Sequence, residues 1–135
     1  MAQRTLDELA ESFAMFDNWE DRYRYLIDLG GRLPPMDNAL KTDEHFVRGC
    51  TSKVWLVAEK RDGKLHFTAD SDALIVKGLI YLLLVAYQDR TADDIAKVNI
   101  ESAFEKIGLH QHLSPNRRNG FFAMVEKIRA LASVA

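Results

Sequence analysis

Apolar residues recur at helical spacing near the start of the chain. Within "TLDELAESFAMF" they lie three or four positions apart, and Thr5 is followed three residues later by Glu8, the spacing of a capping box. "NWEDRYRYLIDLGG" carries a second apolar stripe between Asn18, a preferred N-cap residue, and the pair Gly30–Gly31. The pattern predicts two helices before residue 32.

The apolar period changes to two in the middle of the chain. "KVWLVAEKRDGKLHFTAD" predicts two strands joined by a tight turn at 62–63, with Leu65, Phe67 and Ala69 on one face of the second strand. A lone two-stranded hairpin is marginally stable, so a third strand is expected. The only good candidate is "HFV", residues 45–47.

An almost continuous apolar run follows, "ALIVKGLIYLLLVAY" over 73–87. It is shorter than the roughly 20 residues that span a bilayer, and Lys77 interrupts it, so it predicts a buried core helix. Asp70 and Asp72, just before the run, suit the positive end of that helix.

Helix signals continue to the end of the chain. Thr91 marks one helix start, a short helix is predicted over 100–107 with Gly108 as its stop, and Ser114–Pro115 fits the start of a last helix that ends near 131. Helices, a small antiparallel sheet and helices again indicate an α+β fold, and 135 residues without a linker fit one domain over 1–135.

Composition narrows the functional classes. The chain is 47% hydrophobic and 28% charged with a net charge of -2, so no overall positive field favours nucleic acid or an anionic membrane. One cysteine allows neither an internal disulfide nor a cysteine-only metal site. The first residues lack the pattern of a signal peptide, so a cytoplasmic protein is expected.

The single cysteine, Cys50, lies in "HFVRGCTSKVW" at the break between two predicted strands. Free cysteine is often a small buried hydrophobe, and that remains one interpretation. The other is a reactive thiol: Gly49 frees the backbone, and the positive charges of Arg48 and Lys53 favour the nucleophilic thiolate. Apolar neighbours could shelter its sulfur at rest.

Histidines raise two further alternatives. His45 could act as the base of a cysteine hydrolase that uses Cys50, although no Gly-x-Ser-x-Gly elbow or phosphate loop accompanies them. His110 and His112 offer two metal ligands without a third, so no metal site is predicted. A structural adaptor with an inert thiol is the third hypothesis.

Four segments in order resemble the SufE family of sulfur-acceptor proteins. "GCTSKVW" is similar to that family's Gly-Cys-Gln-Ser-x-Val-Trp motif, with Thr51 where the family usually has glutamine. "NWEDRYRYLIDLGGRLP", "DSDALIVKGLIYLLL" and "QHLSPNRRNG" resemble the family's second helix, its "DSDAxIVxGL" segment and the turn before its last helix.

The resemblance implies the small α+β fold shared with the iron–sulfur scaffold IscU, with a three-stranded antiparallel sheet packed against helices from both chain ends. It also implies an accessory protein, not an enzyme, that activates a SufS-like or CsdA-like cysteine desulfurase. Pyridoxal phosphate would belong to that partner, and the chain would hold no cofactor of its own. A homodimer is possible.

The resemblance further implies the roles of individual residues. Cys50 would take the sulfane sulfur as a persulfide and pass it towards an iron–sulfur scaffold. Residues expected to support its loop or to contact the partner are Arg48, Gly49, Thr51, Ser52 and Arg117.

Overall fold

The computed structural model describes residues 5–48 and 52–134. Gly49, Cys50 and Thr51 lie outside the described residues. The element order is α1 (Leu6–Ala14), α2 (Trp19–Gly30), the 3-10 turns η1 (Asn38–Leu40) and η2 (Asp43–His45), β1 (Val54–Arg61), β2 (Lys64–Ser71), α3 (Leu74–Tyr87), α4 (Ala92–Ala96), α5 (Ile100–Ile107), α6 (Leu109–His112) and α7 (Pro115–Ser133).

The helix starts follow the predicted capping signals. The side chains of Thr5, Asn18, Thr91 and Ser114 each accept a hydrogen bond from a backbone N–H in the first turn of the helix that follows. Gly108 ends α5 in the left-handed region, at φ 85°, as predicted. These predicted boundaries are confirmed. They could be predicted because each depends on side chains only a few residues away.

The hairpin is the predicted one, but the third strand is not there. β1 and β2 pair antiparallel from Val54↔Ser71 to Arg61↔Lys64, and Asp62 and Gly63 form the turn at φ 51° and 77°. The expectation of a three-stranded sheet was wrong for the described residues, which form a two-stranded sheet.

Local bonds explain why "HFV" does not extend as a strand. His45 ends η2, and its Nδ1 lies 2.8 Å from the carbonyl oxygen of Leu40, which holds the ring against the preceding turn. The pairing that remains is short: Phe46 forms a single bridge to Trp55, and the N–H of Val47 bonds the carbonyl oxygen of Val54. Three residues of which the first belongs to a 3-10 turn are too few for a ladder.

The outer edge of β2 is closed by the chain that follows α3. The side-chain amide of Gln88 accepts from the backbone N–H of Phe67 at 2.6 Å and donates to its carbonyl oxygen at 2.7 Å. Leu65 exchanges backbone hydrogen bonds with Asp89 and Arg90 over 2.8–2.9 Å. A buried side chain and two backbone groups thus take the place of a third strand at this edge.

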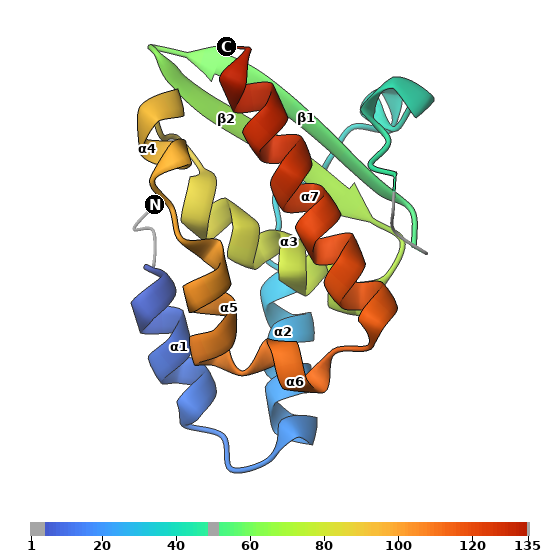
Figure 1. Cartoon of the computed structure of the whole chain (residues 1–135). Helices are drawn as coiled ribbons and strands as arrows, with labels where there is room; N and C mark the ends of the chain where they lie inside the picture. The colour runs from blue at the N-terminus through green and yellow to red at the C-terminus, as the bar shows by residue number, and fades with distance from the viewer. Residues whose placement is uncertain (1–4, 49–51, 135) are drawn as a thin grey trace.

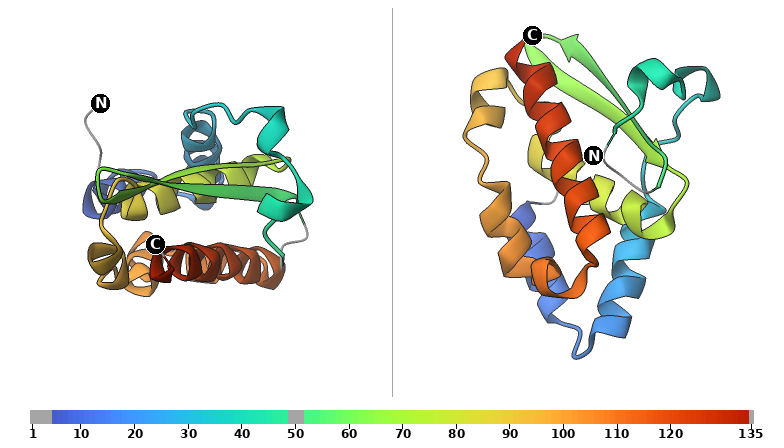
Figure 2. Two further views of the ribbon diagram at one scale, coloured as in Figure 1. Left: turned by 90° about the horizontal axis from the view of Figure 1, so that it is seen from above. Right: turned by 45° about the vertical axis from the view of Figure 1, so that its right-hand side comes forward.

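α3 forms the centre of the packing and contacts α2, β2, α1 and α7. It is buried on nearly all sides, as its continuous apolar sequence predicts. The hairpin turns its apolar face, which includes Leu56, Leu65 and Phe67, into the same core. Figure 1 shows α7 passing in front of the hairpin, and the view from above in Figure 2 shows α7 on one side of the hairpin and the segment with η1 on the other.

Two glycines let α2 and α3 approach closely. A Cβ placed on Gly78 would lie 2.3 Å from the carbonyl oxygen of Leu26, and one on Gly30 would lie 2.7 Å from the backbone nitrogen of Gly78. Gly30 is therefore a packing residue rather than a stop signal. Gly31 caps α2 at φ -66°, in the ordinary helical region, so the predicted glycine stop is not of the left-handed type.

Among the described residues, no helix has both the length and the apolar character needed to cross a bilayer.

Candidate functional site

The two ends of the segment that contains Cys50 are held together by backbone pairing. The N–H of Val47 donates to the carbonyl oxygen of Val54 at 2.8 Å, and Phe46 bridges Trp55 one position further along. The rings of Phe46 and Trp55 meet edge to face, with centroids 6.4 Å apart. The paired residues on the two sides, Phe46–Val47 and Val54–Trp55, therefore form a fixed stem at the start of β1.

The "DSD" segment fixes the exit of this stem. An oxygen of Asp72 accepts from the N–H of Lys53 at 3.0 Å, and the hydroxyl of Ser71 donates to the carbonyl oxygen of Lys53 at 2.7 Å. The N–H of Asp72 also donates to that carbonyl oxygen, at 3.3 Å. Three hydrogen bonds thus tie Lys53 to the end of β2, and the hydroxyl of Ser71 accepts from the N–H of Ala73 at the start of α3.

A small hollow lies beside Ser52, between the N-terminal halves of α3 and α7. Its volume is about 10 Å³, close to the least space that holds one water molecule. Ser52 and Arg117 stand at the polar side, and the remaining lining is mostly apolar: Val76, Leu79, Asn116, Gly120, Phe121 and Met124. The hollow leaves room for about one small group.

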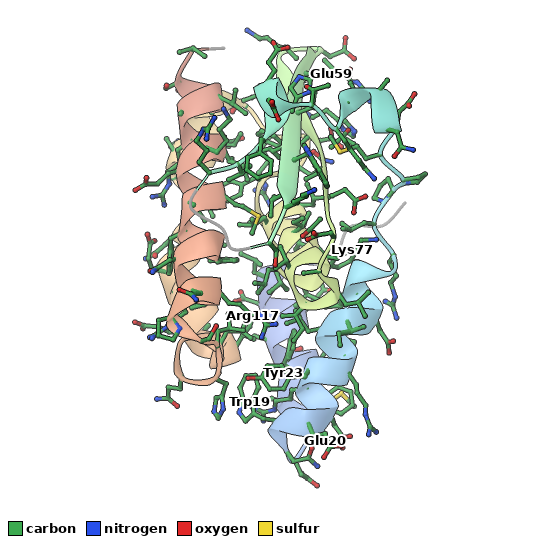
Figure 3. The ribbon with its side chains drawn as sticks, turned by 90° about the vertical axis from the view of Figure 1, so that its right-hand side faces the viewer. Trp19, Glu20, Tyr23, Glu59, Lys77 and Arg117 are labelled. Carbon is green, nitrogen blue, oxygen red and sulfur yellow. The ribbon has the colours of Figure 1, made fainter. Side chains whose placement is uncertain are left out.

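Arg117 is positioned by the turn between α6 and α7. Ser114 caps α7 by accepting from the N–H of Arg117 at 3.3 Å. The ring of Trp19 stacks on His112 with centroids 3.9 Å apart, and the hydroxyl of Tyr23 donates to the carbonyl oxygen of His112. Figure 3 shows Trp19, Tyr23 and Arg117 on one face of the molecule, so α2 supports the turn from which Arg117 extends.

The structure brings together some of the predicted site residues and separates others. Ser52, half-buried, and Arg117, exposed, line the same hollow. Arg48 is exposed and lines a different depression of about 510 Å³ between η2 and α7, whose walls also include Asp43 and Glu126.

The described contacts add no support to the two histidine hypotheses, a hydrolase base at His45 and a metal site at His110 and His112. His112 is occupied in the stack on Trp19. Among the side chains that the structure describes, which do not include that of His110, no three of His, Cys, Asp or Glu gather as metal ligands. His45 holds the turn before the stem through Leu40.

Sequence comparison identifies the family. The family model described as "SufE: Fe-S metabolism associated domain" matches residues 7–132. The chain belongs to the SufE family. Its similarity extends to an uncharacterized SufE-like protein of Rhizobium meliloti, 42% identical over 95% of this chain and 94% of that protein. A second, from Rhizobium etli, is 42% identical over 96% of this chain and 90% of that protein.

A structural comparison agrees on the fold of the SufE chain. The solution structure of a hypothetical protein from Thermus thermophilus superposes with a TM-score of 0.78, covering 100% of this chain and 98% of that one. At 20% identity, this likeness shows the fold alone. The resemblance seen in the four motifs is confirmed at the level of the family by the family match.

An ionic contact next to the stem of this SufE domain was not predicted from the sequence. Asp70 faces Trp55 across the hairpin and lies 3.0 Å from the ammonium of Lys41 and 3.5 Å from that of Lys77. Lys41 also sits over the ring of Trp55, 5.6 Å from its centroid. Asp70 and Asp72 were expected as charges at the start of α3; Asp70 instead links η1, β2 and α3, and Asp72 holds Lys53.

The pKa of Asp70 is lowered from its ordinary value of 3.8. Burial alone would raise it, but the hydrogen bond from Lys41, the backbone N–H of Ser71 and the charge of Lys77 together outweigh burial. A lowered pKa in the folded state means that the ionised carboxylate stabilises the fold above about pH 4. This contribution is lost as the pH falls through the folded-state pKa.

We therefore expect Asp70→Asn to destabilise the protein by about 1–2 kcal/mol at neutral pH, because two lysines lose their shared charge. The deficit should shrink at pH 3, below the ordinary pKa of 3.8, because the unfolded chain is then largely protonated and the stabilisation by the ionised carboxylate decreases. Urea unfolding at both pH values measures this. Glu59→Gln is the control, since the Glu59–Arg61 pair is more than half exposed and should contribute little. A deficit that stays constant with pH would contradict the ionic role of Asp70.

Proposed function

We propose that this SufE-family chain is a sulfur acceptor and activator of a pyridoxal-phosphate-dependent cysteine desulfurase. Cys50 accepts a sulfane sulfur as a persulfide and passes it on for iron–sulfur cluster assembly. The chain acts as an accessory protein, and the pyridoxal phosphate belongs to the SufS-like or CsdA-like partner. The family match over residues 7–132 carries the proposal.

The proposed step is an exchange between a thiolate and a persulfide. The Cys50 thiolate attacks the outer sulfur of a persulfide on the desulfurase's own cysteine. One sulfur–sulfur bond forms to Cys50 and one breaks, and the desulfurase cysteine leaves as a thiolate. The step needs no external oxidant or reductant and no second cysteine, which agrees with a chain that has one.

The surroundings of the segment support this chemistry. Fixed attachments at Val47–Val54 and at Lys53 allow residues 48–53 to be presented from a rigid base, which is how binding segments are commonly positioned. The neighbouring hollow has a mostly apolar lining, and its volume of about 10 Å³ leaves room for about one small group. Shelter of this kind would limit oxidation between transfers.

The remaining predicted residues fall into three groups within the proposal. Ser52 and Arg117 line the hollow and are assigned to loop support, with Arg117 exposed enough to contact a partner as well. Arg48 is assigned to partner contact from the other side of the stem. Gly49 and Thr51 flank Cys50 in the sequence and are assigned to loop conformation.

The test combines the chain with a SufS-like desulfurase, pyridoxal phosphate and cysteine. We expect the intact mass of the chain to increase by one sulfur atom, reversibly with a reductant, and the release of sulfide to accelerate. Peptide mapping should place the added sulfur on Cys50. Addition of an iron–sulfur scaffold protein should then remove it.

Two results would favour the other hypotheses. Hydrolysis of a small ester or amide by the chain alone would indicate a cysteine hydrolase with His45 as its base. An unchanged mass together with unchanged desulfurase turnover, for desulfurases of both partner types, would leave a structural adaptor.

A further inference from the structure

Three large apolar side chains are strongly exposed among the described residues: Met15 at 82%, Leu74 at 63% and Val134 at 83%. Isolated exposed apolar residues are normal on protein surfaces, so exposure alone says little. Their places differ, however. Met15 is the C-cap of α1 and Val134 the C-cap of α7, whereas Leu74 occupies the first position of the central helix α3.

Leu74 stands next to the candidate site. Two residues before it, Asp72 holds the N–H of Lys53 at the exit of the stem. Two residues after it, Val76 lines the hollow with Ser52 and Arg117. Positions two apart in a helix point to different sides, so Leu74 does not line the hollow itself. A protein that docks over the stem and the N-terminal end of α3 would nevertheless meet Leu74, which is exposed there.

Folding does not account for leucine at this position. The first turn of a helix favours acidic or hydroxyl side chains, because they interact with the unpaired N–H groups there. α3 has no such side-chain cap: its N-cap is Ala73, and the hydroxyl of Ser71 accepts only from the N–H of Ala73 itself. Leu74 is not buried either, so its apolar surface contributes little to the free energy of folding.

The charges around Leu74 indicate the chemistry of the partner surface. Lys53, next to Ser52 in the chain, and Arg117, which lines the hollow, are both exposed. Lys41 and Lys77 share the carboxylate of Asp70, and Asp72 bonds the N–H of Lys53. These six residues, four basic and two acidic, carry a net charge of +2, although the whole chain carries -2. Figure 3 shows Lys77 and Arg117 on the same face.

We propose that Leu74 is an anchor for the desulfurase, inserting into an apolar pocket whose rim carries acidic side chains. The inference rests on the proposed function, because it names the partner of that same site. An apolar anchor surrounded by charges that complement those of the partner is the usual anatomy of an energetic centre in an interface.

The experiment measures the dissociation constant for a SufS-like desulfurase by calorimetry, together with the chain concentration that half-saturates stimulation. Leu74→Ala should raise both by about tenfold, since a truncated anchor removes more than a peripheral contact does. Leu74→Glu should raise them further, because it brings a negative charge to an acidic rim. Met15→Glu is the matched control and should leave both unchanged. Equal melting temperatures of all variants verify that each is folded.

The outcomes separate this inference from the proposed function. The anchor is supported if the wild-type chain binds and if this binding weakens with rising salt and in both Leu74 variants. That result would support the anchor even if binding brings no stimulation and the proposed function fails. Wild-type affinity in Leu74→Ala and Leu74→Glu overturns the anchor while leaving sulfur transfer intact. Equal weakening by Met15→Glu also overturns it, because the effect would not be specific to this site. No binding of the wild-type chain overturns both.

Discussion

Replacement of Cys50 by serine is expected to abolish sulfur uptake by the chain and to reduce its stimulation of the desulfurase by about a hundredfold or more. Serine is close to cysteine in size, so the segment between Val47 and Val54 should keep its attachments. Its hydroxyl, however, stays protonated at neutral pH and does not attack a sulfane sulfur. The loss should therefore affect chemistry and spare folding.

Sulfide release and intact mass measure this loss, and calorimetry shows whether the partner is still bound. Cys50→Ser should retain its affinity for the desulfurase, because the proposed anchor and the surrounding charges remain. Ser133→Ala is the control: it removes an exposed hydroxyl at the end of α7 and keeps the thiol, and it should take up one sulfur atom. Undiminished stimulation by Cys50→Ser would reject the carrier mechanism.

The helix boundaries could be predicted because their causes are local. Thr5 and Asn18 each bond a backbone N–H three residues ahead, and Gly108 turns the chain where α5 ends. Such signals are complete within one turn of helix, so the sequence contains them directly. The third strand failed for a related reason: His45 is committed to the carbonyl of Leu40, a competing local bond that an alternating pattern does not reveal.

The site could be predicted only in part, because its supports come from distant segments. The four motifs gave the family, but of the two strands predicted around Cys50 only β1 forms among the described residues. The bond from Lys53 to Asp72 crosses 19 residues, and that from Tyr23 to His112 crosses 89. Neither partner shows periodicity or motif spacing relative to the other, so only the folded chain relates them.

The glycines at the crossing of α2 and α3 are a second case in which the sequence does not reveal a contact between distant segments. Gly30 and Gly31 read alike in sequence, as a pair that ends a helix. In the fold Gly30 contacts Gly78, 48 positions away in the sequence numbering, while Gly31 faces only its own helix. The contact between α2 and α3 thus depends on two residues that have no side chain to reveal it.

Gly78→Ala is accordingly expected to cause a large loss of stability, about 3 kcal/mol in the free energy of unfolding. The new methyl carbon would lie 2.3 Å from the carbonyl oxygen of Leu26 and 2.6 Å from its Cγ. The oxygen belongs to the backbone of α2, so relief requires the two helices to separate and to lose buried contact. Alanine is better than glycine in a helix by about 1 kcal/mol, and this gain offsets only part of the cost.

Urea unfolding of Gly78→Ala and Gly31→Ala measures the steric part by comparing the same substitution at two sites. A methyl group on Gly31 would approach only carbonyl oxygens of its own helix, that of Asp28 most closely at 3.4 Å, and φ there is -66°, which alanine adopts freely. Gly31→Ala should therefore leave stability unchanged or raise it by up to about 1 kcal/mol. Equal effects at the two positions would show that α2 and α3 can move apart at little cost. A large difference means that the close crossing fixes α3, and with it Leu74 and the wall of the hollow, relative to the helix that supports Arg117.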